Sequence, residues 1–202
     1  MDLILIALVA GGILFLKKRD QRQRIVLLGH ALSRYDIERL MEGLTDGYLR
    51  ALGEDNAERQ AQVWNFLAAQ ELRLLEQFQA FATEFANEDP LRTRVSKLPM
   101  AIPYATVWLP AATFDLRRAF AIHAQGLAQV VENAQQLSPK RKAFTLSAEL
   151  FLMQHSCHWF CRSKSVASAR LLARHKTPYA QVLASVSPAT RAAYTALVSG
   201  VA

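Results

Sequence analysis

Four times along this chain, a residue with a small oxygen-bearing side chain stands directly before proline: Asp89-Pro90, Ser138-Pro139, Thr177-Pro178 and Ser187-Pro188. Such a side chain can cap the free N–H groups of a first helical turn, and proline fits the first helical position because its φ is fixed and it has no N–H to satisfy. No run alternates apolar and polar residues convincingly, and no Asn-Gly or Asp-Gly pair joins two such runs. The sequence therefore predicts an all-α fold.

Apolar residues repeat at steps of three and four over residues 37–53 and, most clearly, over residues 55–85. Asp55 with Glu58 resembles a capping box at the start of the second of these helices. Further helices are expected over residues 110–133 and 139–175, followed by two short ones after Thr177 and Ser187. We predict one bundle of about six or seven helices over residues 25–202, preceded by a separate segment at residues 1–24.

This opening segment has an uncharged run, residues 3–16, followed directly by a basic cluster at residues 17–24. A secretory signal has the opposite order, with its positive charge first and a cleavage site of small residues after the apolar run. Basic residues favour the cytoplasmic side of a membrane. We therefore predict a single-pass anchor with its N-terminus outside and the body in the cytoplasm. The anchor residues are Leu3, Ile4, Leu5, Ile6, Leu8, Val9, Ile13, Leu14, Phe15 and Leu16.

The length of this run is the difficulty for a spanning helix. Fourteen helical residues rise about 21 Å, against a hydrocarbon core of about 30 Å. Lys17 and Lys18 could reach the headgroups by snorkelling, and the bilayer could thin around the helix. A core or partner-binding helix and a cleaved signal are the alternatives. Ala7 and Gly11 have the small-residue spacing of helix pairs in membranes, so a homo-oligomer is one expected assembly.

A second uncharged stretch, residues 98–114, is interrupted by Pro99, Pro103 and Pro110 and so cannot form a regular spanning helix. Three interpretations are open. It could cross the domain as a buried connection, which is the usual fate of such a run and the one we expect. It could bind a partner as an exposed apolar patch. It could also dip into a bilayer, where Tyr104 and Trp108 suit the interface.

Metal or haem handling depends on one cluster, His155, Cys157, His158 and Cys161, because thiolate and imidazole suit soft and borderline metals. The spacing is unfavourable, since zinc sites pair C-x2-C with a second pair and covalent haem attachment needs C-x-x-C-H. We therefore expect these residues mainly to pack, with both thiols reduced, and we predict no resident cofactor.

Charge is uneven along the chain, which carries +7 in total. The middle third is acidic and the C-terminal half is basic, which predicts either an anionic partner for that half or a fold in which the two parts face each other. The candidate anion-binding residues are Arg162, Lys164, Arg170, Arg174 and Lys176. The simplest interpretation is a solvated helix end, where cations favour the negative end of the helix dipole. If the segment binds a ligand, an anionic lipid is favoured. Nucleic acid is disfavoured because the segment lacks stacking aromatic residues and a recognisable reading-helix motif.

No catalytic motif is present: the chain has no G-x-S-x-G elbow, no phosphate-binding glycine loop and no H-E-x-x-H pair. The sequence therefore favours a non-enzymatic, membrane-anchored module that faces the cytoplasm and holds or assembles protein partners. Metal or haem handling through the residue 155–161 cluster, and anion binding through residues 162–176, are the alternative functions.

Overall fold

The computed structural model describes residues 2–200, with side chains described from residue 4 onward. Within this range the chain is helical apart from two short strands, so the predicted all-α class is confirmed. Nine α-helices are present in this range. Eight of them follow the opening helix, where six or seven were predicted, because a short helix at residues 105–108 was not expected and the helix predicted over residues 139–175 is divided in two. The nine helices are α1 (Asp2–Leu32), α2 (Ile37–Leu52), α3 (Ala57–Phe85), α4 (Ala105–Trp108), α5 (Leu116–Glu132), α6 (Pro139–Cys161), α7 (Lys164–His175), α8 (Tyr179–Ser185) and α9 (Pro188–Ser199), with a 3-10 turn at Pro110–Ala112.

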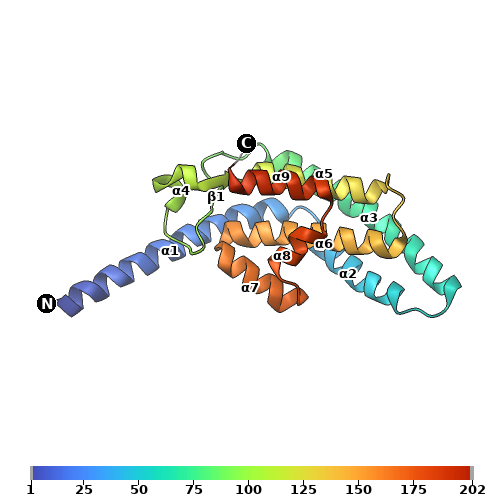
Figure 1. Ribbon diagram of the computed structural model, residues 1–202. Helices are drawn as coiled ribbons and strands as arrows, with labels where there is room; N and C mark the ends of the chain where they lie inside the picture. The colour runs from blue at the N-terminus through green and yellow to red at the C-terminus, as the bar shows by residue number, and fades with distance from the viewer. Residues whose placement is uncertain (1, 201–202) are drawn as a thin grey trace.

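Helix α6 lies in the middle of the body and packs against α1, α2, α5, α7 and α8 (Figure 1). It buries apolar side chains over most of its length, among them Leu146, Leu150 and Trp159. A helix that buries side chains on several faces needs cover on several sides, and these neighbours provide it for most of α6.

A cluster of phenylalanine rings joins α3 to α5. Phe78, Phe81 and Phe85 on α3 are buried against Phe120 on α5, with ring centroids 5.0–6.1 Å apart and mostly edge-to-face. Such ring pairs add stability beyond the burial of their area. The stripe of apolar residues predicted over residues 55–85 is thus confirmed as core, although the helix begins one residue later than the predicted capping box implied, with Asn56 as its N-cap.

The helix predicted over residues 139–175 is interrupted at Arg162. Ser163 accepts a hydrogen bond from the backbone N–H of Val166 and so caps a new helix, α7. A serine that can cap offers the chain an alternative to continuing the helix. The Ser187-Pro188 start is confirmed, with Ser187 accepting from the N–H of Thr190. The start predicted at Asp89-Pro90 is wrong, because that segment forms a turn.

The two strands, β1 (Arg94–Ser96) and β2 (Thr113–Asp115), pair antiparallel with Val95 opposite Phe114. Trp159 on α6 holds this pair, because its indole N–H donates to the Ser96 carbonyl at 2.8 Å and its ring packs edge-to-face on Phe114. Three residues per strand are too few to show an alternating pattern in the sequence. This strand pair holds together the two ends of the loop that contains α4.

The predicted boundary between residues 24 and 25 falls inside α1, which is one continuous helix of 31 residues. Its second half packs on the body, where Gln21, Leu28 and Ala31 are buried. Its first half extends alone beyond the other elements (Figure 1). Residues 4–16 of α1 are called the arm below.

Candidate functional site

The arm has no cover from the other described parts of the chain. Its large apolar side chains are 40–69% exposed, and they occur on every side of the helix. The interpretation of this segment as a core helix is therefore wrong for residues 4–16. The predicted anchor residues with described side chains are all exposed; the side chain of Leu3 lies outside the described residues. They are Ile4, Leu5, Ile6, Leu8, Val9, Ile13, Leu14, Phe15 and Leu16.

In the described part of the chain, residues 2–200, no helix combines the length and the apolar character that crossing a membrane requires. The predicted single-pass span is therefore not supported. The physical reason is the one that the sequence already showed: the uncharged run stops at Lys17, after about 21 Å of helix.

The side chains of the predicted metal cluster turn to different partners. His155 is buried, with Nε2 3.1 Å from the Ser168 hydroxyl, whereas His158 Nδ1 lies 3.2 Å from the Arg170 guanidinium. Cys157 Sγ faces the Met153 sulfur at 3.9 Å. Among residues 2–200, no group of three or more His, Cys, Asp or Glu is placed to hold a metal ion.

Burial also makes these groups poor ligands and nucleophiles. Desolvation raises the pKa of Cys161 to about 11 and raises the pKa of Cys157 as well, so both thiols stay protonated at neutral pH. Both cysteines are free, as expected. Burial, with the charges of Arg170 and Arg174, lowers the pKa of His158 to about 4. The geometry of this cluster is that of a packed helix rather than a metal site.

The five predicted anion-binding residues are separated by the fold. Arg162 donates to Gln21 Oε1 on α1 at 2.6 Å, and Lys164 lies over the rings of Trp159 and Tyr179. Arg170 contacts His158, and Lys176 donates to the Ala173 carbonyl. Arg174 pairs with Glu42 on α2, so an acid far away in the sequence opposes a cation that the local sequence left unopposed.

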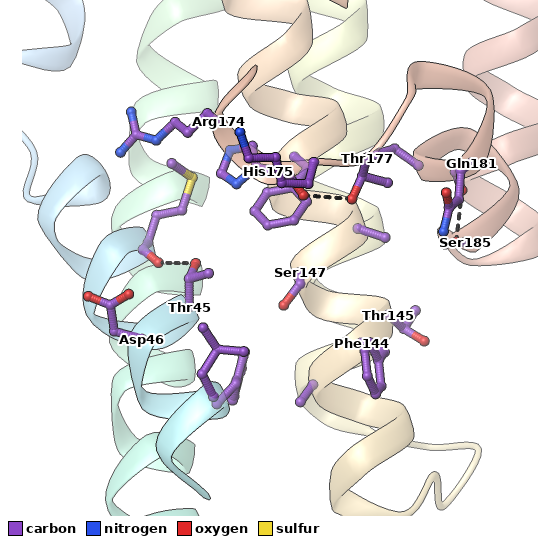
Figure 2. A pocket seen from close by; sticks show the side chains of 18 of the residues that line it. Thr45, Asp46, Phe144, Thr145, Ser147, Arg174, His175, Thr177, Gln181 and Ser185 are labelled. Carbon is purple, nitrogen blue, oxygen red and sulfur yellow. Dashed lines mark hydrogen bonds between the residues drawn. The ribbon is translucent and has the colours of Figure 1, made fainter. Parts of the chain in front are cut away.

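That ion pair stands at the rim of a cleft between α2, α6, α7 and α8, with a volume of about 720 Å³ (Figure 2). Thr45 and Asp46 come from α2, Phe144 and Ser147 from α6, and Arg174 from the end of α7. The cleft has the size of a small-molecule or peptide-side-chain site. Acids on α2 face bases on α7, so the cleft selects neither cations nor anions by net charge.

The hydroxyl groups around this cleft are used locally. Thr45 donates to the Met41 carbonyl and Ser185 to the Gln181 carbonyl, both one helical turn back, and Thr177 donates to the His175 carbonyl (Figure 2). His175 itself stacks on Phe151 at 3.7 Å between centroids and contacts Gln154 Oε1. None of these three hydroxyls is paired with a base that could activate it.

A buried polar cluster, which no pattern in the sequence indicates, joins α5, α6 and α9. The Ser156 hydroxyl lies 2.9 Å from His123 Nε2 and 3.0 Å from the Tyr194 hydroxyl. It donates to the Leu152 carbonyl, and all three side chains are fully buried. Burial and the charge of His155 lower the pKa of His123 to about 3. Although serine beside histidine resembles a nucleophile and its base, no substrate reaches this pair, which joins three helices instead.

The loop between β1 and β2 is exposed, so the expected burial of residues 98–114 is wrong for most of its length. Val107 and Trp108 on α4 are 73% and 78% exposed, and Met100 and Ile102 also face outward. Residues 100–109 are called the hook below. Arg24 on α1 holds the hook, donating to Thr106 Oγ1 at 3.1 Å and to the Arg94 carbonyl at 2.9 Å.

Comparison of the chain with protein-family models, with curated proteins and with solved structures finds no match. Function is therefore inferred from the geometry of this chain alone.

Proposed function

We propose that this protein is a membrane-associated helical module in which the arm enters lipid and the body binds a protein partner at the cytoplasmic face. The observation that carries the proposal is the arm itself. Residues 4–16 are apolar on every side, and no other element covers them. Water is a poor solvent for such a surface, since burying one large apolar side chain yields about 1.5–3 kcal/mol.

Lipid fits the arm better than a protein groove does. A partner helix or groove would cover one stripe of the arm and leave the remaining apolar faces in water. Hydrocarbon surrounds the whole helix, and the arm contains no polar side chain that needs a partner. Lys17 and Lys18 follow at the level where headgroups begin, and their charge favours the cytoplasmic side. Within lipid, the open space around Gly11 lets a second arm approach closely, which gives a route to a homo-oligomer.

Flotation of the full chain with neutral phosphatidylcholine vesicles tests the arm. The unmodified chain should float with the vesicles, and Leu8→Asp should lower the partition coefficient about 100-fold, because a carboxylate in the hydrocarbon costs about 2.5–3.5 kcal/mol. Phe66→Asp is the matched control. Phe66 lies on α3 and, at 65%, is about as exposed as Leu8 at 68%, yet its substitution should leave flotation unchanged.

Two results would contradict the lipid assignment. One is an unmodified chain that stays with the unbound protein. The other is a Leu8→Asp variant that floats as well as the unmodified chain, because the arm would then not be the segment in contact with lipid.

We assign partner binding by the body to the cleft between α2 and α7. Leu49 and Phe144 at its lining are 68% and 59% exposed, and Glu42 with Arg174 forms a charged rim. An apolar centre with a charged rim is the usual anatomy of an interface. Affinity purification in mild detergent should recover a co-purifying protein with the unmodified chain and with Leu72→Asp, but not with Phe144→Asp. Recovery of the unmodified chain alone, as a monomer, would count against this part of the proposal.

A further inference from the structure

We propose that a groove at the base of the arm binds the phosphate of an anionic phospholipid, whose acyl chains lie along the arm and the hook. This inference rests on the proposed membrane association and names the lipid class that the protein recognises. The groove lies between α1 and residues 91–107 and has a volume of about 610 Å³. We call it the arginine groove because Arg19, Arg22, Arg24 and Arg92 line it.

The charge of the arginine groove is unbalanced. Asp20 is the only acid in its lining, and Arg24 Nε pairs with it at 3.2 Å. The other two nitrogen atoms of the Arg24 guanidinium donate to Thr106 in the hook and to the Arg94 carbonyl on β1, so this arginine has a structural role. Arg19, Arg22 and Arg92 are exposed, and none of them pairs with an acid in the described part of the chain. Three unopposed guanidinium groups at one groove fit an anion.

The arrangement of these three arginines fits a phosphate in particular. Arg19 and Arg22 lie three residues apart on α1 and therefore share a side of the helix. Arg92 comes from the turn before β1 and lines the groove from the opposite wall. Guanidinium groups bind phosphate oxygens in bidentate pairs, so a phosphate between the two walls can be held from both sides.

The surroundings of the groove favour a lipid over a soluble phosphate. Leu91 and Val107 line it and are 65% and 73% exposed, and Trp108 continues the apolar surface outward. In Figure 1, α4 lies at the end of the body from which the arm projects. Tryptophan is enriched at the level of the headgroups. A soluble phosphate would need the arginines alone, whereas a phospholipid also uses the apolar residues beside them.

The test compares flotation of the full chain with neutral phosphatidylcholine vesicles and with vesicles that also contain phosphatidylglycerol. The unmodified chain should prefer the anionic vesicles, and Arg22→Gln with Arg92→Gln should lower that preference about 10- to 30-fold, since each arginine near an anionic surface contributes substantially to binding. Binding to neutral vesicles should not change, because the arm is intact. Arg50→Gln with Arg59→Gln removes the same charge from exposed positions on α2 and α3 and should have little effect.

A second measurement separates a lipid from a free phosphate. Inorganic phosphate at millimolar concentration should leave the preference for anionic vesicles largely intact, and Val107→Asp should reduce it. If inorganic phosphate abolishes the preference while Val107→Asp does not affect it, the groove binds free phosphate and the lipid assignment is wrong.

The remaining outcomes distinguish the two proposals from each other. If the two double arginine variants lose the preference for anionic vesicles equally, or if neither loses it, the arginine groove is overturned. Flotation with neutral vesicles, which depends on the arm, would persist in that case. If the unmodified chain does not float with neutral vesicles, the proposed function itself is overturned.

Discussion

The arm and α6 both lack a single amphipathic stripe, yet their surroundings are opposite. On α6, Leu146, Leu150 and Leu152 are fully buried by helices on all sides, whereas the large side chains of the arm are exposed and the arm extends alone (Figure 1). A helix that is apolar all round belongs in the centre of a protein or in a membrane, and the arm does not lie in the centre of this one.

The polar residues of the two helices account for the difference. Helix α6 contains Glu149, His155 and Ser156, all fully buried. Each has at least one hydrogen-bond partner on another element: Glu149 Oε1 accepts from the Ser187 backbone N–H at 2.9 Å, and His155 Nε2 and the Ser156 hydroxyl contact hydroxyl groups on α7 and α9. These groups need protein around them, since a buried polar group without a partner is costly. The arm has no such group, so its side chains need no hydrogen-bond partner from the protein.

The largest expected difference between the two helices concerns leucine truncation. Leu150→Ala should lower the free energy of unfolding by about 2–5 kcal/mol, because it leaves a cavity in the packed centre of the body. Leu8→Ala should change it by less than about 0.5 kcal/mol, because the arm makes no packing contact that the substitution removes. Urea unfolding in detergent-free buffer measures both. A loss of several kcal/mol in Leu8→Ala would mean that the arm folds back onto the body in solution.

Features that depend on a few neighbouring residues could be predicted from the sequence. The apolar stripe over residues 55–85, the cap at Ser187 and the uncharged run before Lys17 each reflect local spacing or capping chemistry. The same local signals failed where two of them competed. The sequence pattern predicted one helix that continues through Ser163. Instead, the Ser163 side chain accepts a hydrogen bond from the Val166 N–H and caps a new helix, so the earlier helix ends before it.

Features that depend on distant residues could not be predicted. The arginine groove joins residues 19–24 of α1 to Arg92, and nothing near Arg92 in the sequence marks it as the partner of those residues. The cations of residues 162–176 instead contact separate partners, among them Gln21 on α1, Glu42 on α2 and His158 on α6. His123 and Ser156 meet across 33 positions in the chain, and only the packing of α5 on α6 brings them together.

A smaller effect is expected from removing the hydroxyl of Ser156. Ser156→Ala should lower the free energy of unfolding by about 1–3 kcal/mol, because it leaves His123 Nε2 and the Tyr194 hydroxyl without their buried partner. Ser185→Ala is the matched control, since that exposed hydroxyl bonds only within α8 and water can replace it. Equal effects of the two substitutions in urea unfolding would show that the buried cluster does not stabilise α6.

The buried histidines should make the body, but not the arm, sensitive to acid. Burial lowers the pKa of His123 and of His155 to about 3, so below about pH 6.5 the unfolded chain takes up protons that the folded chain does not. Stability should therefore fall as the pH drops from about 6 to about 4, by up to about 1.4 kcal/mol per pH unit for each histidine. The raised pKa of buried Glu149 acts in the opposite direction, since it favours the folded state at low pH.

His123→Gln isolates this contribution, because the slope of stability against pH can be compared even if the variant is less stable overall. Between about pH 4 and about pH 6, we expect the slope of the free energy of unfolding against pH to decrease by the contribution of one histidine, up to about 1.4 kcal/mol per pH unit. Urea midpoints measured at several pH values provide the slope. An unchanged slope would mean that His123 takes up its proton in the folded state at an ordinary pKa.

The smallest effect is expected at the rim of the cleft, outside α6. Arg174→Gln should lower the free energy of unfolding by about 0.2–1 kcal/mol at most, because its ion pair with Glu42 is about half exposed on both sides and solvent screens it. Glu42→Gln should give the same small effect, and the double variant should add little. A loss above about 2 kcal/mol would show that the pair closes the body over α6. A small loss instead leaves the α2 and α7 walls free to separate, as a cleft that admits a partner requires.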